Sequence, residues 1–196
     1  MRSSFFASAL FVGATVIACA APPTTVAPPT APRAALPSSS GAMPSPDAPT
    51  TCVGGVPTIA ELEASPKATI PEKAIGKAGD GRLCEAKAFR VRTALTVHRV
   101  WDGAKPESRV GRWWALEAPK GTTSDYRKAY AICPEWSAAN RSVTCKVKAG
   151  AEVVLGTGQS AKCADGTVYP AAATVQMFVP DPASSIEGCT EGQAFP

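Results

Sequence analysis

The chain of 196 residues is poor in the residues that metal sites and nucleophilic catalysis require. Its only histidine is His98, and no two of its seven cysteines stand in a C-x-x-C spacing. Zinc sites are usually built from closely spaced cysteines and histidines, so the sequence predicts neither a metal site nor a resident cofactor. No local nucleophile signature surrounds any serine, which disfavours a serine hydrolase.

Charge is also sparse. Twenty Lys and Arg stand against sixteen Asp and Glu, and removal of Arg2 with an N-terminal signal would leave a balance near +3. A duplex binder shows Lys and Arg clustered on one element. Here Lys67, Lys73, Lys77 and Arg82 are spread through a Pro- and Gly-punctuated stretch that we predict to be a solvated loop. The sequence therefore predicts no nucleic-acid partner.

A long apolar run occurs only at the N-terminus. Arg2 precedes FFASALFVGATVIA, which is about as long as the apolar region of a signal peptide and too short to span a bilayer. We therefore predict that residues 1–18 are a signal peptide and that the protein is exported.

The end of this segment carries a possible anchor signal. Residues 16–19 read VIAC and resemble a bacterial lipobox, which implies acylation of Cys19 and attachment to a membrane. Ala20, in place of an aspartate, then implies sorting to the outer membrane or cell surface. The alternative is an ordinary signal peptide cleaved near Ala20 or Ala21, with Cys19 lost.

Six cysteines remain after Cys19, and an even number suits three disulfides in an exported domain. Six cysteines allow fifteen pairings. The pairing with short sequence separations, which we take as the expectation, is Cys52 with Cys84, Cys133 with Cys145, and Cys163 with Cys189.

Composition divides the rest of the chain into a linker and one domain. Residues 19–51 are rich in Pro, Ala, Ser and Thr and contain no aromatic residue, so they are predicted to be a disordered tether. As polyproline II such a tether would reach up to about 100 Å. Residues 52–196 hold all four tryptophans and all three tyrosines and are predicted to form one globular domain.

Apolar patterning in this domain predicts many strands and few helices. Capping boxes predict a short helix at Ile59–Ala64 and one or two helical turns at Ser124–Tyr130. Strands are predicted at Ala86–Arg92, Leu95–Trp101, Arg112–Leu116, around Val143–Val147, at Val153–Leu155 and around Val175–Val179. The expected class is α+β, strand-dominated, with mostly antiparallel sheets and disulfide cross-links.

The stretch LTVHRVWDG, residues 95–103, places an arginine on an apolar strand face. Leu95, Val97 and Trp101 share that face with Arg99. Either Arg99 extends to solvent from an edge strand, or it points into a cleft that binds an anion.

The stretch GTGQSA, residues 156–161, formally fits the dinucleotide fingerprint G-x-G-x-x-A. A Rossmann loop must open a helix, yet Cys163-Ala164-Asp165-Gly166 follows within two residues. We therefore predict a turn with exposed backbone N–H groups near a site.

The order of the motifs adds a family resemblance. The stretches that carry this resemblance are, in chain order, HRVWDG, GRWW, a short helix with YR, AICPEWS, VTCKVKAGAEV, GTGQSA and VQMFV. Through them the domain resembles the tuberculosis-necrotizing-toxin-like NAD glycohydrolases and related ADP-ribosyltransferase-like toxin domains. The resemblance covers roughly residues 95–180. It implies that Arg99 receives the NAD phosphates and that Gln176 acts catalytically near the nicotinamide ribose.

Chemistry refines these roles. A guanidinium suits a diphosphate, because it is permanently charged and presents a planar fork of donors. The amide of Gln176 can orient hydroxyls or water but cannot stabilise positive charge as a carboxylate does, which disfavours transferase activity. The alternative for Gln176 is an ordinary solvent-facing position. Trp113 and Trp114 point to opposite strand faces, so one is expected in the core and the other against a ligand, with Ser160 nearby.

Two functions follow from this sequence. In the first, a surface lipoprotein uses a cleft lined by Arg99, Trp113 or Trp114, Ser160 and Gln176 as an NAD glycohydrolase or to bind NAD or another anionic small molecule. In the second, the domain is a non-catalytic envelope module that binds an envelope or target-cell protein or a glycan. Convergence of Arg99, Gln176 and the 156–160 turn on one pocket would favour the first function.

Overall fold

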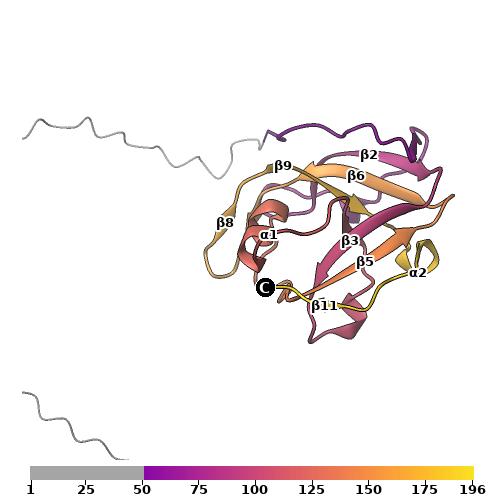
Figure 1. Cartoon of the computed structure of the whole chain (residues 1–196). Helices are drawn as coiled ribbons and strands as arrows, with labels where there is room; N and C mark the ends of the chain where they lie inside the picture. The colour runs from indigo at the N-terminus through magenta and orange to yellow at the C-terminus, as the bar shows by residue number, and fades with distance from the viewer. Residues whose placement is uncertain (1–50) are drawn as a thin grey trace, which may run out of the picture. The chain divides into compact units, whose positions relative to one another are not determined.

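The computed structural model describes residues 51–196 (Figure 1). The predicted signal peptide, Cys19 and nearly all of the predicted tether lie outside the described residues. In the described part the fold is a strand-rich antiparallel sheet with two short α-helices and three disulfides, which confirms the expected class. No helix in this part of the chain is both long and apolar enough to cross a membrane.

Nine strands form the main sheet, in the order β1-β2-β6-β9-β4-β3-β5-β10, with β11 also paired to β5, and all these pairs are antiparallel. A separate hairpin pairs β7 with β8. The strands are β1 (Leu62–Ala64), β2 (Leu83–Val91), β3 (Leu95–Trp101), β4 (Trp113–Ala115), β5 (Arg141–Val147), β6 (Glu152–Gly158), β7 (Ala161–Lys162), β8 (Val168–Tyr169), β9 (Ala172–Phe178), β10 (Ile186–Glu187) and β11 (Gln193–Ala194).

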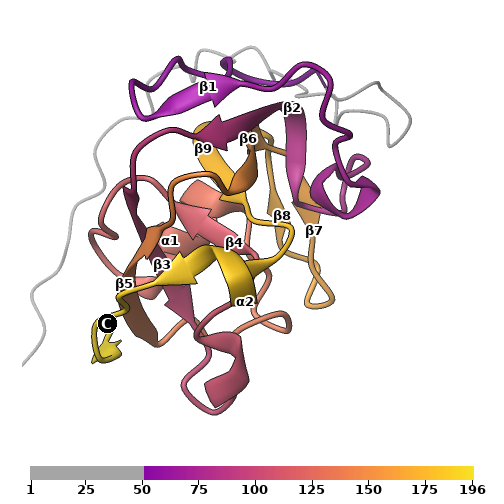
Figure 2. The ribbon, with the colours of Figure 1, turned by 90° about the vertical axis from the view of Figure 1, so that its right-hand side faces the viewer.

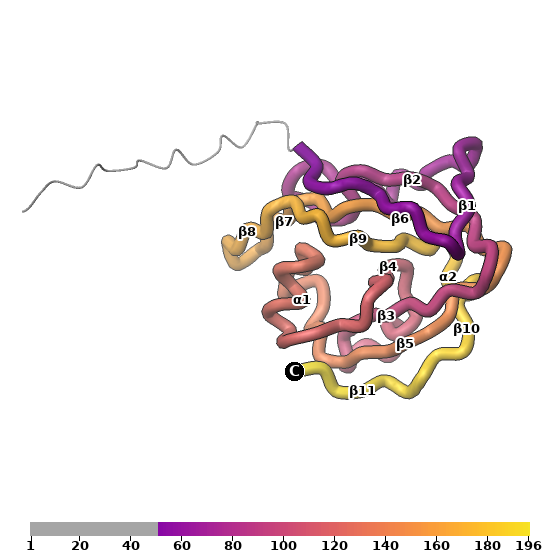
Figure 3. The backbone as a smooth tube through the Cα atoms, turned by 45° about the horizontal axis from the view of Figure 1, so that its top comes forward, coloured from indigo at the N-terminus to yellow at the C-terminus, as the bar shows by residue number. Residues whose placement is uncertain are grey.

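The sheet curls around its own core. Leu62 in β1 and Ile186 in β10 lie at opposite ends of the strand order, yet both belong to one buried cluster that includes Leu155 and Met177. Figure 3 shows the consequence: β2, β6 and β9 form one layer, β3, β5 and β11 form the other, and β4 lies between them. The two layers enclose the apolar residues, as in a sandwich made from a single bent sheet.

Helix α1 (Thr123–Tyr130) lies at one end of the molecule, between β9 and β11 (Figures 1 and 3). Its start matches the predicted capping box: the Thr122 side chain accepts from the Asp125 N–H, and the Asp125 carboxylate accepts from the Thr122 N–H. Tyr126 packs with Val100 of β3, which fixes α1 against the sheet. The remaining helical segments are α2 (Pro182–Ser185), η1 (Glu72–Ala74) and η2 (Pro106–Ser108). Helix α2, drawn in yellow in Figure 2, leads directly into β10.

The predicted helix at Ile59–Ala64 is wrong. Leu62–Ala64 forms β1 instead and pairs with β2 through Leu62 and Val91. The stretch between Pro57 and Pro66 is too short to offset the cost of helix nucleation, whereas the open edge of β2 supplies hydrogen bonds at once.

Two of the three expected disulfide pairings are also wrong. Cys52 pairs with Cys84 as expected, but Cys133 pairs with Cys163 and Cys145 with Cys189. The C-terminal segment runs beside β5, where the Thr190 N–H donates to the Thr144 carbonyl at 2.9 Å. This pairing brings Cys189 to Cys145, so tertiary structure overrides sequence separation.

The stretch GTGQSA is not an exposed turn. Gly156 to Gly158 belong to β6 and are buried. A Cβ on Gly156 would lie 2.2 Å from the Glu85 carbonyl oxygen, so glycine allows β2 to approach at its bulge.

Candidate functional site

A cavity of about 340 Å³ lies where α1 and the segment after it meet the sheet. This volume is at the lower end of the range for small-molecule sites. Its lining combines cationic, aromatic and amide side chains: Arg82, Arg99, Val100, Trp113, Tyr130, Ala131, Ile132, Trp136, Ser137 and Gln176. Three of the predicted site residues, Arg99, Trp113 and Gln176, are therefore brought together.

Arg99 is not a solvent-facing edge residue, because β3 lies inside the sheet between β4 and β5. Strands β3 and β4 pair only at His98 and Ala115. Beyond that point the Arg99 guanidinium bridges the gap, with Nε donating to the Ser108 carbonyl at 2.9 Å and Nη1 to the Trp113 carbonyl at 2.7 Å. Arg99 thus has a structural role as well as a place in the cavity.

Burial lowers the pKa of Arg99 from its usual value. A guanidinium nevertheless stays charged at physiological pH. It also has five N–H donors in a planar fork, more than the two carbonyl groups use. The cavity therefore holds a fixed positive charge that can still donate to an anion.

Gln176 lies in β9 and is only 7 % exposed, so the solvent-facing alternative is wrong. Its Nε2 donates to the Tyr130 carbonyl at 3.3 Å, and Gly158 leaves room beside that amide. This bond uses the donor end of the amide, and Oε1 is the end that accepts hydrogen bonds. The amide therefore presents an acceptor that a ligand can use.

Aromatic rings form two sides of the cavity. Trp113 packs edge-on against Phe178, with ring centroids 5.0 Å apart. Trp136 is 45 % exposed, which leaves ring surface free for stacking. Burial, together with Glu117, raises the pKa of Tyr130 to about 12, so its hydroxyl is protonated at neutral pH. Tyr130 can therefore donate a hydrogen bond but cannot serve as a base there.

Arg82 adds a second guanidinium to the lining. It is exposed and makes one long bond, from Nη1 to the Ile75 carbonyl at 3.4 Å. Its backbone has a φ of 70°, a conformation that costs free energy for a residue with a Cβ. Ala131 also lines the cavity and has a φ of 50°. It is the C-cap of α1, and a left-handed residue is a common way to end a helix.

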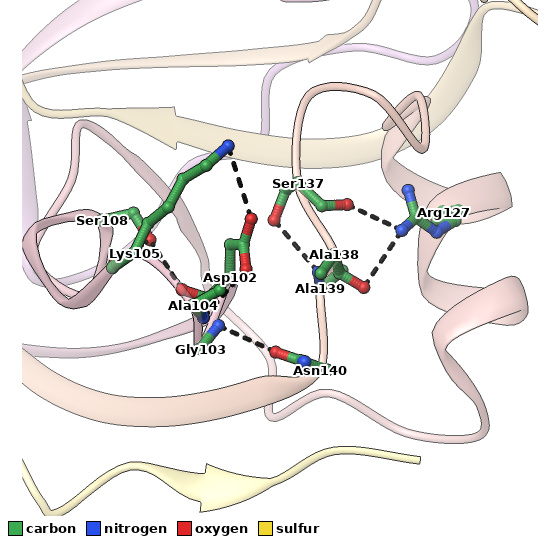
Figure 4. A network of polar contacts seen from close by, with 10 residues as sticks. All are labelled: Asp102, Gly103, Ala104, Lys105, Ser108, Arg127, Ser137, Ala138, Ala139 and Asn140. Atoms are coloured by element: carbon green, nitrogen blue, oxygen red, sulfur yellow. Dashed lines mark hydrogen bonds and ion pairs between the residues drawn. The ribbon is translucent and has the colours of Figure 1, made fainter.

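The segment 131–137 forms the outer wall and is firmly held. Arg127 of α1 donates from Nη2 to the carbonyls of Ser137 at 2.7 Å and Ala138 at 3.0 Å (Figure 4). The Cys133–Cys163 disulfide ties the same segment to the β7–β8 hairpin. The wall is thus preorganised, which lowers the entropic cost of binding.

The neighbouring turn after β3 is built around Asp102. Its carboxylate accepts from the Ala104 N–H at 3.0 Å and lies 3.5 Å from the Lys105 ammonium (Figure 4). The Ala104 N–H is the main cause of the lowered pKa of Asp102. The Gly103 N–H donates to Asn140 Oδ1 at 2.8 Å, which joins this turn to the end of the 131–140 segment.

Two predicted site residues lie elsewhere. Trp114 is 2 % exposed, sits in the main core and donates from Nε1 to the Gly111 carbonyl at 2.7 Å. Ser160 accepts from the Gly79 N–H at 3.0 Å and donates to Gln159, and it does not line the cavity.

The sequence patterns do not single out three of the lining residues, Arg82, Tyr130 and Trp136. Arg82 is far along the chain from the other two, and its Pro- and Gly-punctuated stretch predicts a solvated loop. Gly81, which precedes Arg82, is the sequence feature that indicates a close approach at this point. Gly81 has a φ of 68°, and a Cβ there would lie 2.9 Å from the Trp136 ring.

A second grouping, of Cys133, Glu135 and Cys163, places three ligand-type atoms within 4.8 Å of one another. Both sulfurs are joined in a disulfide, which removes their thiolate character. The Glu135 carboxylate accepts from the Ala164 N–H at 2.8 Å. The group therefore acts as a structural cross-link.

Comparisons with protein-family models, curated proteins and solved structures found no match for this chain. We therefore infer its function from the geometry of the cavity and from the motifs in the sequence.

Proposed function

We propose that the domain is an exported binding module for a small anionic ligand that carries a flat ring. The observation that carries this proposal is the meeting of two guanidiniums, from Arg82 and Arg99, with the rings of Trp113 and Trp136 in one cavity. Guanidinium forks recognise phosphate and carboxylate groups, and exposed indole surface stacks on flat rings. An NAD-type molecule is the candidate that the sequence resemblance suggests.

The lining favours binding over NAD hydrolysis. No aspartate or glutamate is among the residues that line the cavity. Loss of nicotinamide develops positive charge on the ribose, and two nearby guanidiniums would oppose that charge. Gln176 then acts as an orienting hydrogen-bond partner of the ligand.

Three disulfides support the proposal of export, since such bonds persist mainly in oxidising compartments. Attachment through Cys19 to the outer membrane or cell surface remains the expectation from VIAC. It is tested by detergent partitioning of the wild type and Cys19→Ser. Equal partitioning of both into the aqueous phase would contradict it.

The ligand proposal is tested by calorimetry with NAD and, separately, with nicotinamide mononucleotide, alongside an assay for released nicotinamide. We expect saturable binding without turnover. Arg82→Gly should weaken binding by about tenfold or more, because a charge-assisted contact is lost. The same variant should not lose stability, because glycine accepts the left-handed backbone at this position.

Arg92→Gln provides the matched control, since Arg92 is exposed and does not line the cavity. Absence of affinity for both probes would contradict the nucleotide assignment. It would favour the second function, a module that recognises a protein or glycan through the exposed Trp136. Nicotinamide release by the wild type, lost in Gln176→Ala, would restore the catalytic assignment.

A further inference from the structure

A second cavity, of about 350 Å³, lies beyond the end of β4, beside the first half of β9. Its lining includes Leu116, Glu117, Tyr130, Thr174 and Val175. Each of these residues is exposed or half-buried. The side chains that form the cavity are therefore accessible to a ligand.

The second cavity is a neighbour of the first. Tyr130, at the end of α1, lines both of them. On β9, Val175 of the second cavity is followed directly by Gln176 of the first, and the Gln176 amide donates to the Tyr130 carbonyl at 3.3 Å. One extended ligand can therefore place different groups in the two cavities.

The two linings carry opposite charges. Arg82 and Arg99 are the charged residues of the first cavity, whereas Glu117 is the only charged residue in the lining of the second. Glu117 is exposed and forms no ion pair with the described part of the chain. Its carboxylate is therefore not neutralised, and the second cavity attracts positive charge.

Tyr130 supplies an aromatic ring next to this carboxylate. Burial is the main cause of the raised pKa of Tyr130, and the charge of Glu117 adds to it, as expected when the carboxylate lies near the phenol. Tyr126 packs against the Tyr130 ring, with centroids 4.4 Å apart, and fixes its orientation. An aromatic ring and a carboxylate side by side recognise organic cations, because both attract positive charge and the ring also contacts carbon atoms.

We propose that the second cavity holds a cationic group of the same ligand whose anionic group binds to Arg82 and Arg99. This inference rests on the proposed function and narrows the ligand to a zwitterion that carries an organic cation. Glu117 supplies the opposite charge and Tyr130 the aromatic contact. The side chains of Leu116 and Val175 supply apolar walls for the carbon atoms of the cation.

The cation site is tested first with fragments that lack any anionic group. Nicotinamide methylated on its ring nitrogen is cationic, whereas nicotinamide itself is neutral, and the two have nearly the same shape. Each is titrated into the ¹⁵N-labelled full chain while the backbone amide signals of Glu117 and Thr174 are followed. We expect saturable shifts with the methylated form and an affinity about tenfold lower for nicotinamide.

A second titration, by calorimetry, joins the two cavities. Nicotinamide mononucleotide carries a phosphate and a cationic ring, and its reduced form carries the same phosphate and a neutral ring. We expect the oxidised form to bind about tenfold more tightly. Glu117→Gln should remove this preference by weakening the oxidised form alone. Glu152→Gln is the matched control, because Glu152 is exposed and lines neither cavity.

Equal affinities for the two mononucleotides would overturn the proposal and leave the anion site of the proposed function intact. An equal loss of both affinities in Glu117→Gln would overturn it as well. Binding of neither mononucleotide would contradict the proposed function instead. The fragments then decide the cation site by itself: saturable shifts with the methylated form support it, and their absence overturns it.

Discussion

At the scale of single residues, Arg99 shows how one side chain serves both fold and site. Strand alternation places it among apolar residues, and in the structure its guanidinium binds two backbone carbonyls, of Ser108 in η2 and of Trp113 in β4. Gln176 is a similar case, since it is buried, lines the cavity and is held by a hydrogen bond from Nε2 to the Tyr130 carbonyl. Both side chains are therefore fixed before any ligand arrives.

We expect Arg99→Lys to lower the free energy of unfolding by about 1.5 to 3 kcal/mol, because lysine cannot reach both carbonyls at once. Arg92→Lys, at an exposed position, should change it by less than about 0.5 kcal/mol. Urea denaturation of the three proteins measures both values. Equal stability of all three would show that the Ser108 and Trp113 bonds contribute nothing.

His98 predicts a pH dependence. Burial lowers the pKa of His98, so the unfolded chain binds a proton at a higher pH than the folded chain does. The contribution of neutral His98 to the free energy of unfolding is therefore fully present above about pH 6.5, and it is lost as the pH falls below that value. Carboxylates with a lowered pKa, such as Asp102, titrate only at more acidic pH and do not mask this effect.

Denaturation curves at pH 7.5 and pH 5 should therefore differ more for the wild type than for His98→Gln. The glutamine can keep a hydrogen bond to Thr144, whose Oγ1 lies 3.0 Å from His98 Nδ1. The same loss of stability in both proteins would assign the pH dependence to other groups.

At the scale of elements, the segments that line the cavity beside α1 are short, and local hydrogen bonds and a disulfide hold them in place. Helix α1 supplies Tyr130, and the segment that follows supplies Trp136 and Ser137. A capping box begins the helix, and Arg127 and one disulfide hold the segment. Loss of the capping box, of the Arg127 hydrogen bonds or of this disulfide should make the cavity wall more mobile.

Thr122→Ala removes the capping hydroxyl of α1 and should cost about 1 kcal/mol of stability. Ser124→Ala, an exposed change in the same first turn, should be close to neutral. Thermal unfolding followed by circular dichroism compares the two variants. A larger loss in Ser124→Ala than in Thr122→Ala would contradict the role of the capping box.

The disulfides allow a matched comparison. Cys133–Cys163 and Cys145–Cys189 span 30 and 44 residues, so loop-closure entropy predicts a similar loss of about 4 kcal/mol when either pair is changed to serine. Only the first pair holds the wall of the first cavity. We therefore expect weaker binding of the NAD-type probe in Cys133→Ser/Cys163→Ser alone, measured by calorimetry below the melting temperature of both variants.

At the scale of the whole molecule, one core joins both ends of the sheet. Leu155 lies at its centre and is fully buried, in the cluster that also holds Leu62 and Ile186. When this core is disrupted, strands from β1 to β10 therefore lose their packing at the same time. This arrangement favours a single cooperative unfolding transition.

Leu155→Ala should destabilise the protein by about 2 to 5 kcal/mol while keeping one transition. Val168→Ala, at a position that is 63 % exposed, provides the control and should have little effect. Far-ultraviolet circular dichroism and tryptophan fluorescence should give coincident curves. Two separate transitions would show that the layers unfold independently.

The sequence by itself determined the strand-rich class, most strand positions, the helix at α1 and the use of six cysteines in disulfides. These features follow from local patterns, because alternation, capping boxes and cysteine parity act over short stretches. It also singled out Arg99 because it interrupts an apolar strand face, Trp113 as one of two adjacent tryptophans on opposite faces, and Gln176 through the family resemblance.

Only the tertiary structure decided which cysteines pair, which tryptophan lies in the core and which residues complete the cavity. Gly81 packs against Trp136, and Gly192 packs against Trp101, although each pair is far apart along the chain. The curling of the sheet brings these pairs together, and it depends on packing among all the strands at once rather than on any local pattern.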